Sequence, residues 1–175
     1  MLLYPLLALT CVWAAWQDTK GNPDDRSIPP CAEATCRGKR IGHMLNMFQF
    51  CIPHGMKYRR VAGFEGDLHD RVTLSTHGEH SELIIFTANF TWGPVKTGPD
   101  NWPAPDSAHG ETLSISQWRC SEGDGHDFKF QRAGRNWRLL TFPFGFAEYE
   151  DVPTSAAERF DKVLDSLCCK SFPPN

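Results

Sequence analysis

The chain ends in two adjacent cysteines, and this pair constrains the fold more than any other feature of the sequence. A disulfide between Cys168 and Cys169 would force the peptide that joins them away from planar trans geometry. We therefore expect each cysteine to bond a partner elsewhere. Such bonds would fasten the C-terminal segment to two other parts of the chain.

The cysteine count predicts an exported, disulfide-bonded protein. The sequence has 175 residues and seven cysteines, the first of them in an apolar N-terminal run. The six that remain are an even number, typical of disulfides formed in the periplasm or outside the cell. No C-x-x-C spacing occurs, which disfavours zinc. We expect a local Cys31–Cys36 bond, with Cys51 and Cys120 bonded to the C-terminal pair. The six are Cys31, Cys36, Cys51, Cys120, Cys168 and Cys169.

Residues 1–14 are predicted to be a signal peptide. The apolar run is too short to cross a bilayer, and Val12 and Ala14 are acceptable at the −3 and −1 positions of a cleavage site. The run contains no lysine or arginine, which departs from the usual signal-peptide pattern. A lipoprotein anchor at Cys11 and a buried N-terminal segment stay open as alternatives. Residues 15–30 are polar with several prolines, and are expected to form a flexible lead-in.

Residues 31–175 have the composition of a single globular domain. Hydrophobic residues make up 41% of the sequence and aromatic residues 12%, which is enough for one substantial core. The net charge is −3 and no long basic run occurs, so we expect no nucleic-acid partner. We also expect no membrane span and no cofactor. The sequence does not indicate an oligomeric state.

Alternating apolar residues predict an antiparallel sheet of about six to seven strands. The alternation is clear in residues 47–53, MFQFCIP, where Phe48, Phe50 and Ile52 share one face. The continuous apolar run of residues 82–90 suits a central strand covered on both faces. Other strand signals lie in residues 54–63, 71–76, 111–118, 127–132 and 136–144, the last two flanking a turn at Gly134.

An amphipathic helix is predicted near the C-terminus, with Cys168 continuing its buried side. Ser155 and Glu158 have capping-box spacing at its start. Residues 38–46, GKRIGHMLN, are expected to contribute a short helix. The sequence thus predicts an α+β fold, a sheet with the C-terminal helix packed on it and disulfides as braces. The apolar stripe of this helix comprises Ala156, Phe160, Val163, Leu164 and Leu167.

Two polar stretches were considered as metal sites and are expected to be hairpin ends. Residues 68–80, LHDRVTLSTHGEH, contain three histidines, but His77, Glu79 and His80 are too few for a closed structural site. Residues 121–127, SEGDGHD, resemble a loose calcium loop without the spacing of an EF-hand. Glycine with aspartate is also a common turn composition. We therefore expect no metal.

The candidate binding site is the irregular stretch of residues 91–110, which contains four prolines and two tryptophans. A loop of this length in a compact domain is commonly functional or disordered. Trp92 and Trp102 would supply rigid apolar anchors, with a polar rim around them. The alternative is that both tryptophans fold back over the core as a lid. The predicted rim consists of Lys96, Asp100 and Asp106.

Two stretches resemble PsbP-like domains. Residues 47–67, MFQFCIPHGMKYRRVAGFEGD, resemble the opening of such a domain, and residues 140–167, LTFPFGFAEYEDVPTSAAERFDKVLDSL, resemble its close. The resemblance implies an antiparallel sheet with helices packed on it. It also implies a non-enzymatic role in binding a protein or another partner, and it supplies no site residues.

The sequence therefore predicts an exported, non-enzymatic domain that binds a protein. One alternative is an inhibitor or immunity-type protein against a secreted enzyme. Another is a small extracytoplasmic hydrolase that uses Asp, Glu or His: no G-x-S-x-G elbow occurs, but a pair of carboxylates is not excluded. A glycosylation sequon at Asn89 has meaning only in a eukaryotic producer.

Overall fold

A computed structural model describes residues 26–43, 47–62, 68–76, 79–87, 96–143 and 145–170. The predicted signal peptide and most of the lead-in lie outside these residues. Within them the chain forms eleven strands and one α-helix, α1 (Thr154–Leu164). The strands are β1 (Arg26–Ser27), β2 (Gly38–His43), β3 (Phe48–Pro53), β4 (Lys57–Ala62), β5 (Leu68–Thr76), β6 (Glu79–Thr87), β7 (Ser114–Cys120), β8 (Gly123–Arg132), β9 (Arg135–Phe142), β10 (Gly145–Pro153) and β11 (Cys168–Cys169).

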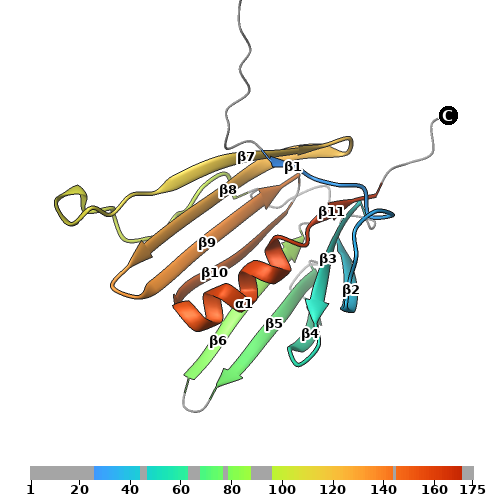
Figure 1. The fold of residues 1–175 in the computed structure, drawn as a ribbon, viewed down its shortest axis with the longest axis horizontal. Helices are drawn as coiled ribbons and strands as arrows, with labels where there is room; N and C mark the ends of the chain where they lie inside the picture. The colour runs from blue at the N-terminus through green and yellow to red at the C-terminus, as the bar shows by residue number, and fades with distance from the viewer. Residues whose placement is uncertain are drawn as a thin grey trace, which may run out of the picture.

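The strands form two sheets (Figure 1). The larger has eight strands in the order β1-β7-β8-β9-β10-β6-β5-β4, and the smaller has three in the order β11-β3-β2. Neighbours are antiparallel except β1 and β7, which are parallel, so the larger sheet is mixed. The predicted α+β class, with a single antiparallel sheet of about six to seven strands, is therefore wrong. The described chain is mostly β.

Residues 38–46 do not form the expected helix where the structure describes them, because Gly38–His43 is strand β2. Glycines at positions 38 and 42 weaken a helix, whereas β2 pairs along its whole length with β3. At Gly38 the two strands approach so closely that a Cβ would lie 2.0 Å from the carbonyl oxygen of Ile52. This register therefore requires glycine at that position.

The core lies between the larger sheet and a layer made of α1 and the smaller sheet (Figure 1). Phe160 and Leu164 of α1 are fully buried, as is Phe50 of β3. They pack with Leu140 and Phe142, which share one face of β9 because side chains alternate along a strand. We call this side of the larger sheet the core face and the opposite side the loop face.

The helix is shorter than the sequence predicted. It begins after Pro153, which makes no side-chain capping bond, and Ser155 and Glu158 are both exposed, so the predicted capping box is wrong. It ends at Leu164, and Cys168 lies in β11 rather than on the helix. The turn after the helix lets the chain pair as a strand with β3.

Three disulfides join Cys31 to Cys168, Cys36 to Cys51, and Cys120 to Cys169. The prediction that the two adjacent cysteines bond separate partners is confirmed, whereas the local Cys31–Cys36 bond and the assignment of Cys51 are wrong. The chain before Cys31 runs beside β11, where the backbone N–H of Cys31 donates to the carbonyl of Cys169. The disulfides indicate an oxidising, non-cytoplasmic compartment. Among the residues described, no helix is long and apolar enough to cross a membrane.

Candidate functional site

The loop face of the larger sheet is covered in part by residues 96–113, which we call the crossing segment. The face presents a row of buried apolar side chains on β8 and β9. A Cβ at Gly98 would lie 4.0 Å from the Phe128 ring, so the segment passes directly over this row. At its far end Arg132 donates to the carbonyl of Ala104 and to Glu111, at 2.6 and 2.7 Å. The buried side chains of this row are Phe128, Phe130, Trp137 and Leu139.

Lys96 fixes the start of the crossing segment to β10. Its Nζ lies 2.5 Å from Oε2 of Glu148 and 3.9 Å from Oε1 of Glu150. The Lys96 and Glu148 side chains are each only 13% exposed. Burial raises the pKa of the Glu148 carboxyl above its ordinary value, although the Lys96 ammonium opposes this. The rim lysine predicted from the sequence thus attaches the crossing segment to β10.

Trp102 is the second attachment of the crossing segment to β10. Its indole N–H donates to Oε1 of Glu150 at 3.0 Å, and the residue is half-buried. Asp100 is exposed, two residues before it. The structure therefore brings Lys96 and Trp102 together at two glutamates of one strand. The predicted second anchor, Trp92, lies outside the described residues.

Asp106 makes its contacts within the crossing segment itself. It caps the short 3-10 helix Ser107–His109 by accepting from the backbone N–H of Ala108 at 2.9 Å. Its other oxygen lies 2.7 Å from Nδ1 of His109, and this contact lowers the pKa of the Asp106 carboxyl. The side chain shapes the segment rather than extending the contacts made by Lys96 and Trp102.

A hollow of about 350 Å³ lies beside these attachments, between β6 and β10. Glu148 and Glu150 line it, together with His80 and Glu82 of β6, and we call it the acidic hollow. Arg71 of the neighbouring strand holds Glu82 at 2.6 Å. Sequence reasoning missed both glutamates of β10. The signal was present in the EYE pattern, where a buried Tyr149 between two acids predicts a strand with both carboxylates on the other face.

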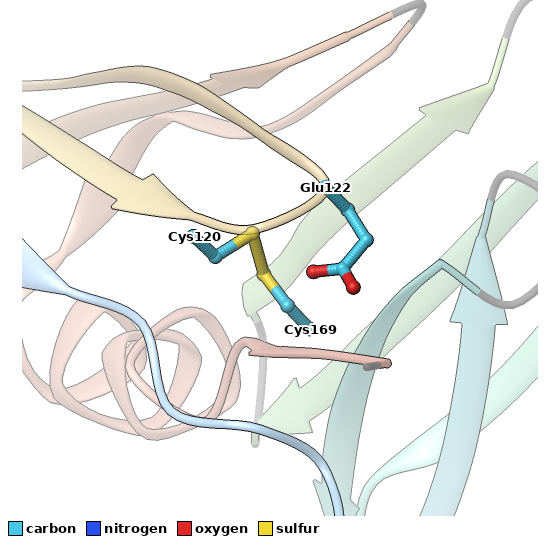
Figure 2. Close-up of side chains that lie close together, drawn as sticks. All are labelled: Cys120, Glu122 and Cys169. Carbon is cyan, nitrogen blue, oxygen red and sulfur yellow. A yellow bond between two sulfur atoms is a disulfide. The ribbon is translucent and has the colours of Figure 1, made fainter. Parts of the chain in front are cut away.

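Cys120, Glu122 and Cys169 are the one group in the described chain with the spacing of metal ligands, their ligand atoms lying within 4.8 Å of one another. Figure 2 shows that the two sulfurs are bonded to each other and that the Glu122 carboxylate lies beside them. Sulfurs joined in a disulfide are not thiolates, the form that binds metal. The oxidised group is therefore a disulfide with an adjacent carboxylate.

Among the described residues, neither sequence-based metal candidate brings three ligand side chains together. The SEGDGHD stretch is a turn that leads into β8, and its Asp127 is buried and bound to Arg138. In the histidine-rich stretch, β5 and β6 form the expected hairpin. His80 is exposed, His77 lies outside the described residues, and the side chain of His69 is likewise not described.

Arg138 forms a buried charge cluster on the core face. Its guanidinium is fully buried and donates to both oxygens of Asp127, at 2.9 and 2.7 Å. It also donates to Asp161 and Asp165 of α1, each at 2.7 Å. Burial by itself would lower the pKa of Arg138. The hydrogen bonds and charge of Asp127, together with the charges of Asp165 and Asp161, outweigh burial and raise the pKa above its ordinary value. Because these donors and acceptors are paired with one another, the cluster ties α1 to the sheet.

Comparison with known proteins gives no relatives. No family model matches the chain, and no curated protein or solved structure matches it. The resemblance to PsbP-like domains stays a prediction.

Proposed function

We propose that the protein is an exported, non-enzymatic domain, secreted or periplasmic, that binds a protein partner on its loop face. The surface consists of the crossing segment around Trp102 and the adjoining acidic hollow. One observation carries the proposal: Trp102 is a half-exposed ring held at the edge of a hollow by its bond to Glu150. A rigid aromatic side chain beside a preformed depression is a common anchor in protein interfaces.

The charge of the hollow favours a basic side chain from the partner. Glu82 and Glu150 are partly exposed, with side-chain exposures of 24% and 40%. Lys96 and Arg71 hold the carboxylates in place without covering them. Preorganised acids at an interface favour a complementary charge and reduce the cost of ordering on binding. An inhibitor of a secreted enzyme would use the same surface.

A hydrolase at the same hollow is the second candidate, and one observation favours it. Glu148 and Glu150 approach a single ammonium, and burial raises the pKa of Glu148. Glycoside hydrolysis uses two nearby carboxylates, one of them an acid with a raised pKa. Glu148→Gln separates the two functions, because it would abolish hydrolysis of glycosides by the purified protein.

The test of the binding proposal is Trp102→Ala, with Ile115→Ala as a matched control. Ile115 of β7 is 51% exposed and pairs with Phe128, so it lies on the loop face but outside the proposed surface around Trp102 and the acidic hollow. A partner is first captured from the native compartment and its affinity measured by titration calorimetry. We expect Trp102→Ala to weaken binding at least tenfold with a small change in melting temperature, and Ile115→Ala to change neither. A large loss of melting temperature with unchanged affinity would identify Trp102 as a lid.

A further inference from the structure

Two of the disulfides have opposite charges beside their sulfurs, Arg40 at Cys31–Cys168 and Glu122 at Cys120–Cys169. We infer that Cys31–Cys168 is a thiol-exchange site, at which a low-molecular-weight thiol attacks Cys31 and Cys168 leaves as a thiolate stabilised by Arg40. The inference is independent of the proposed binding function, because it rests on the opposite side of the larger sheet.

Arg40 is positioned to stabilise a negative sulfur at position 168. Its Nη1 lies 3.0 Å from Sγ of Cys168, on the side of the smaller sheet where the lead-in crosses. Its position is fixed by contacts to the carbonyls of Ala34 and Cys31, at 2.9 and 3.5 Å, and to the amide oxygen of Gln49 at 3.4 Å. The guanidinium therefore does not need to move when the disulfide opens.

The charge of Arg40 is not neutralised in the described chain. Its four acceptors are two carbonyls, an amide oxygen and a sulfur, and the structure gives it no carboxylate partner among the described residues. Arg40 is also half-buried, so solvent screens its charge less than that of a surface arginine. A thiolate on Cys168 would supply the missing anion.

Burial decides which sulfur is attacked. Cys31 is half-buried, whereas Cys168 is completely buried. An external thiolate therefore reaches Cys31, and Cys168 is left as the departing sulfur, next to Arg40. Exchange is faster when the leaving thiolate is better stabilised.

The Cys120–Cys169 disulfide has the opposite charge beside it. Both of its sulfurs lie within 4.8 Å of the Glu122 carboxylate, which is directed toward them in Figure 2. This carboxylate repels an approaching thiolate and destabilises a departing one. The adjacent cysteines 168 and 169 thus belong to one disulfide whose surroundings favour exchange and one whose surroundings resist it.

The step is balanced. The thiolate of the added thiol forms a bond to Sγ of Cys31, the Cys31–Cys168 bond breaks, and its electron pair stays on Sγ of Cys168. Attack by a second thiolate on the mixed disulfide releases the oxidised small thiol and a Cys31 thiolate, which takes up a proton from solvent. The result is the loss of the covalent tie between the lead-in and β11.

The test uses the full mature chain and reduced glutathione. The protein is incubated for increasing times at a pH where glutathione is partly ionised, and free thiols are blocked by alkylation. Peptide mass spectrometry then maps the adducts. We expect glutathione on Cys31 and an alkylated Cys168 before any change at the other four cysteines. A first adduct on Cys120, Cys36 or Cys168 would overturn the inference.

Variants separate the charge effect from simple access. Arg40→Met is expected to slow exchange at Cys31 roughly tenfold, and Glu122→Gln to speed exchange at Cys120–Cys169 without affecting Cys31. Gln49→Glu gives Arg40 a carboxylate partner and should slow exchange while keeping the arginine, which covers the case that Arg40→Met does not fold. Gln131→Glu, an exposed change on β8, is the matched control for added charge. Unchanged rates at Cys31 in both Arg40→Met and Gln49→Glu would refute the role of Arg40.

Discussion

The two faces of the larger sheet are covered by different means. On the core face, α1 and the smaller sheet bury a continuous apolar core, and disulfides join the ends of this layer to the lead-in and to β7. On the loop face, the crossing segment passes over Phe128 and is attached by side-chain contacts such as those of Lys96 and Trp102. The layer on the core face is thus held by apolar packing and by disulfides. The crossing segment on the loop face is held by polar side-chain contacts, which polar groups of a partner could replace.

This difference indicates where binding is possible. Burying a large apolar side chain such as Phe160 contributes about 2–3 kcal/mol, and the core face contains many of them. An ion pair near the surface contributes about 0–1 kcal/mol, and removing one partner of the more buried Lys96–Glu148 pair costs about 1–3 kcal/mol. A partner therefore gains access to the loop face at small cost, whereas the core face opens only on unfolding.

The largest expected effect comes from removing the buried guanidinium of Arg138 on the core face. Arg138→Met leaves the Asp127 side chain, which is 8% exposed, without its two hydrogen bonds to Arg138 and with the half-exposed Lys129 ammonium 3.7 Å away. We expect a loss of about 3–5 kcal/mol in the free energy of unfolding, because an uncompensated buried charge remains. Urea unfolding followed by circular dichroism measures it. Arg135→Met on the same strand, whose pair with Asp151 is exposed, is the control and should cost about 0–1 kcal/mol. Equal losses in the two variants would contradict the structural role of the buried cluster.

The corresponding change on the loop face is Lys96→Met, with a smaller expected effect. Glu148 then stays buried without its ammonium partner, at a cost of about 1–3 kcal/mol. The double variant Lys96→Met, Glu148→Gln should recover part of this loss, because no carboxylate is left unpaired. Urea unfolding of the three proteins provides the measurement. A loss as large as that of Arg138→Met would show that the crossing segment is part of the core.

The smallest expected effect concerns how the free energy of unfolding depends on pH in acid. Asp165 in the Arg138 cluster and Glu148 on the loop face should change this dependence in opposite directions. Burial alone would raise the pKa of Asp165, but Arg138 lowers it below its ordinary 3.8. The stabilisation contributed by the ionised Asp165 carboxylate is therefore fully present above its ordinary pKa. It is lost as the pH falls through the lower pKa that Asp165 has in the folded protein. Because the side chain is 53% exposed, Asp165→Asn should cost less than about 1 kcal/mol at neutral pH and nothing in strong acid.

Glu148 provides the opposite case. Its pKa is raised above 4.5, so its contribution to stability decreases as the pH rises through this range. The stability of Glu148→Gln relative to the unchanged protein should therefore increase with pH, and that of Asp165→Asn should decrease. Unfolding free energies measured across the acid range test both, and slopes of the same sign would contradict the assignment.

Much of the strand pattern could be predicted from local sequence. Alternation in residues 47–53 corresponds to β3, and the two stretches around Gly134 correspond to β8 and β9, which are joined by a turn with positive φ at Ala133 and Gly134. Each of these signals comes from side chains whose face is set by period two. The apolar stripe of α1 was equally readable, and its Ala156, Phe160, Val163 and Leu164 are buried.

The candidate site was less predictable because its contacts are distant in sequence. Lys96 and Trp102 were readable as candidates, but Glu148 and Glu150, which hold them, lie about 50 residues further on. Nor could the Cys31–Cys168 pairing be read locally, since it depends on the lead-in running beside β11. Strand order and register decide such contacts.

The sequence by itself determined that adjacent cysteines must bond separate partners, since peptide geometry is local. It also determined the position of several strands and the apolar stripe of the helix, since side-chain periodicity is local too. Only the tertiary structure decided how the strands divide between two sheets, which cysteines pair, and which glutamates meet Lys96. Those outcomes depend on which distant segments bury one another, and no short stretch of sequence contains that information.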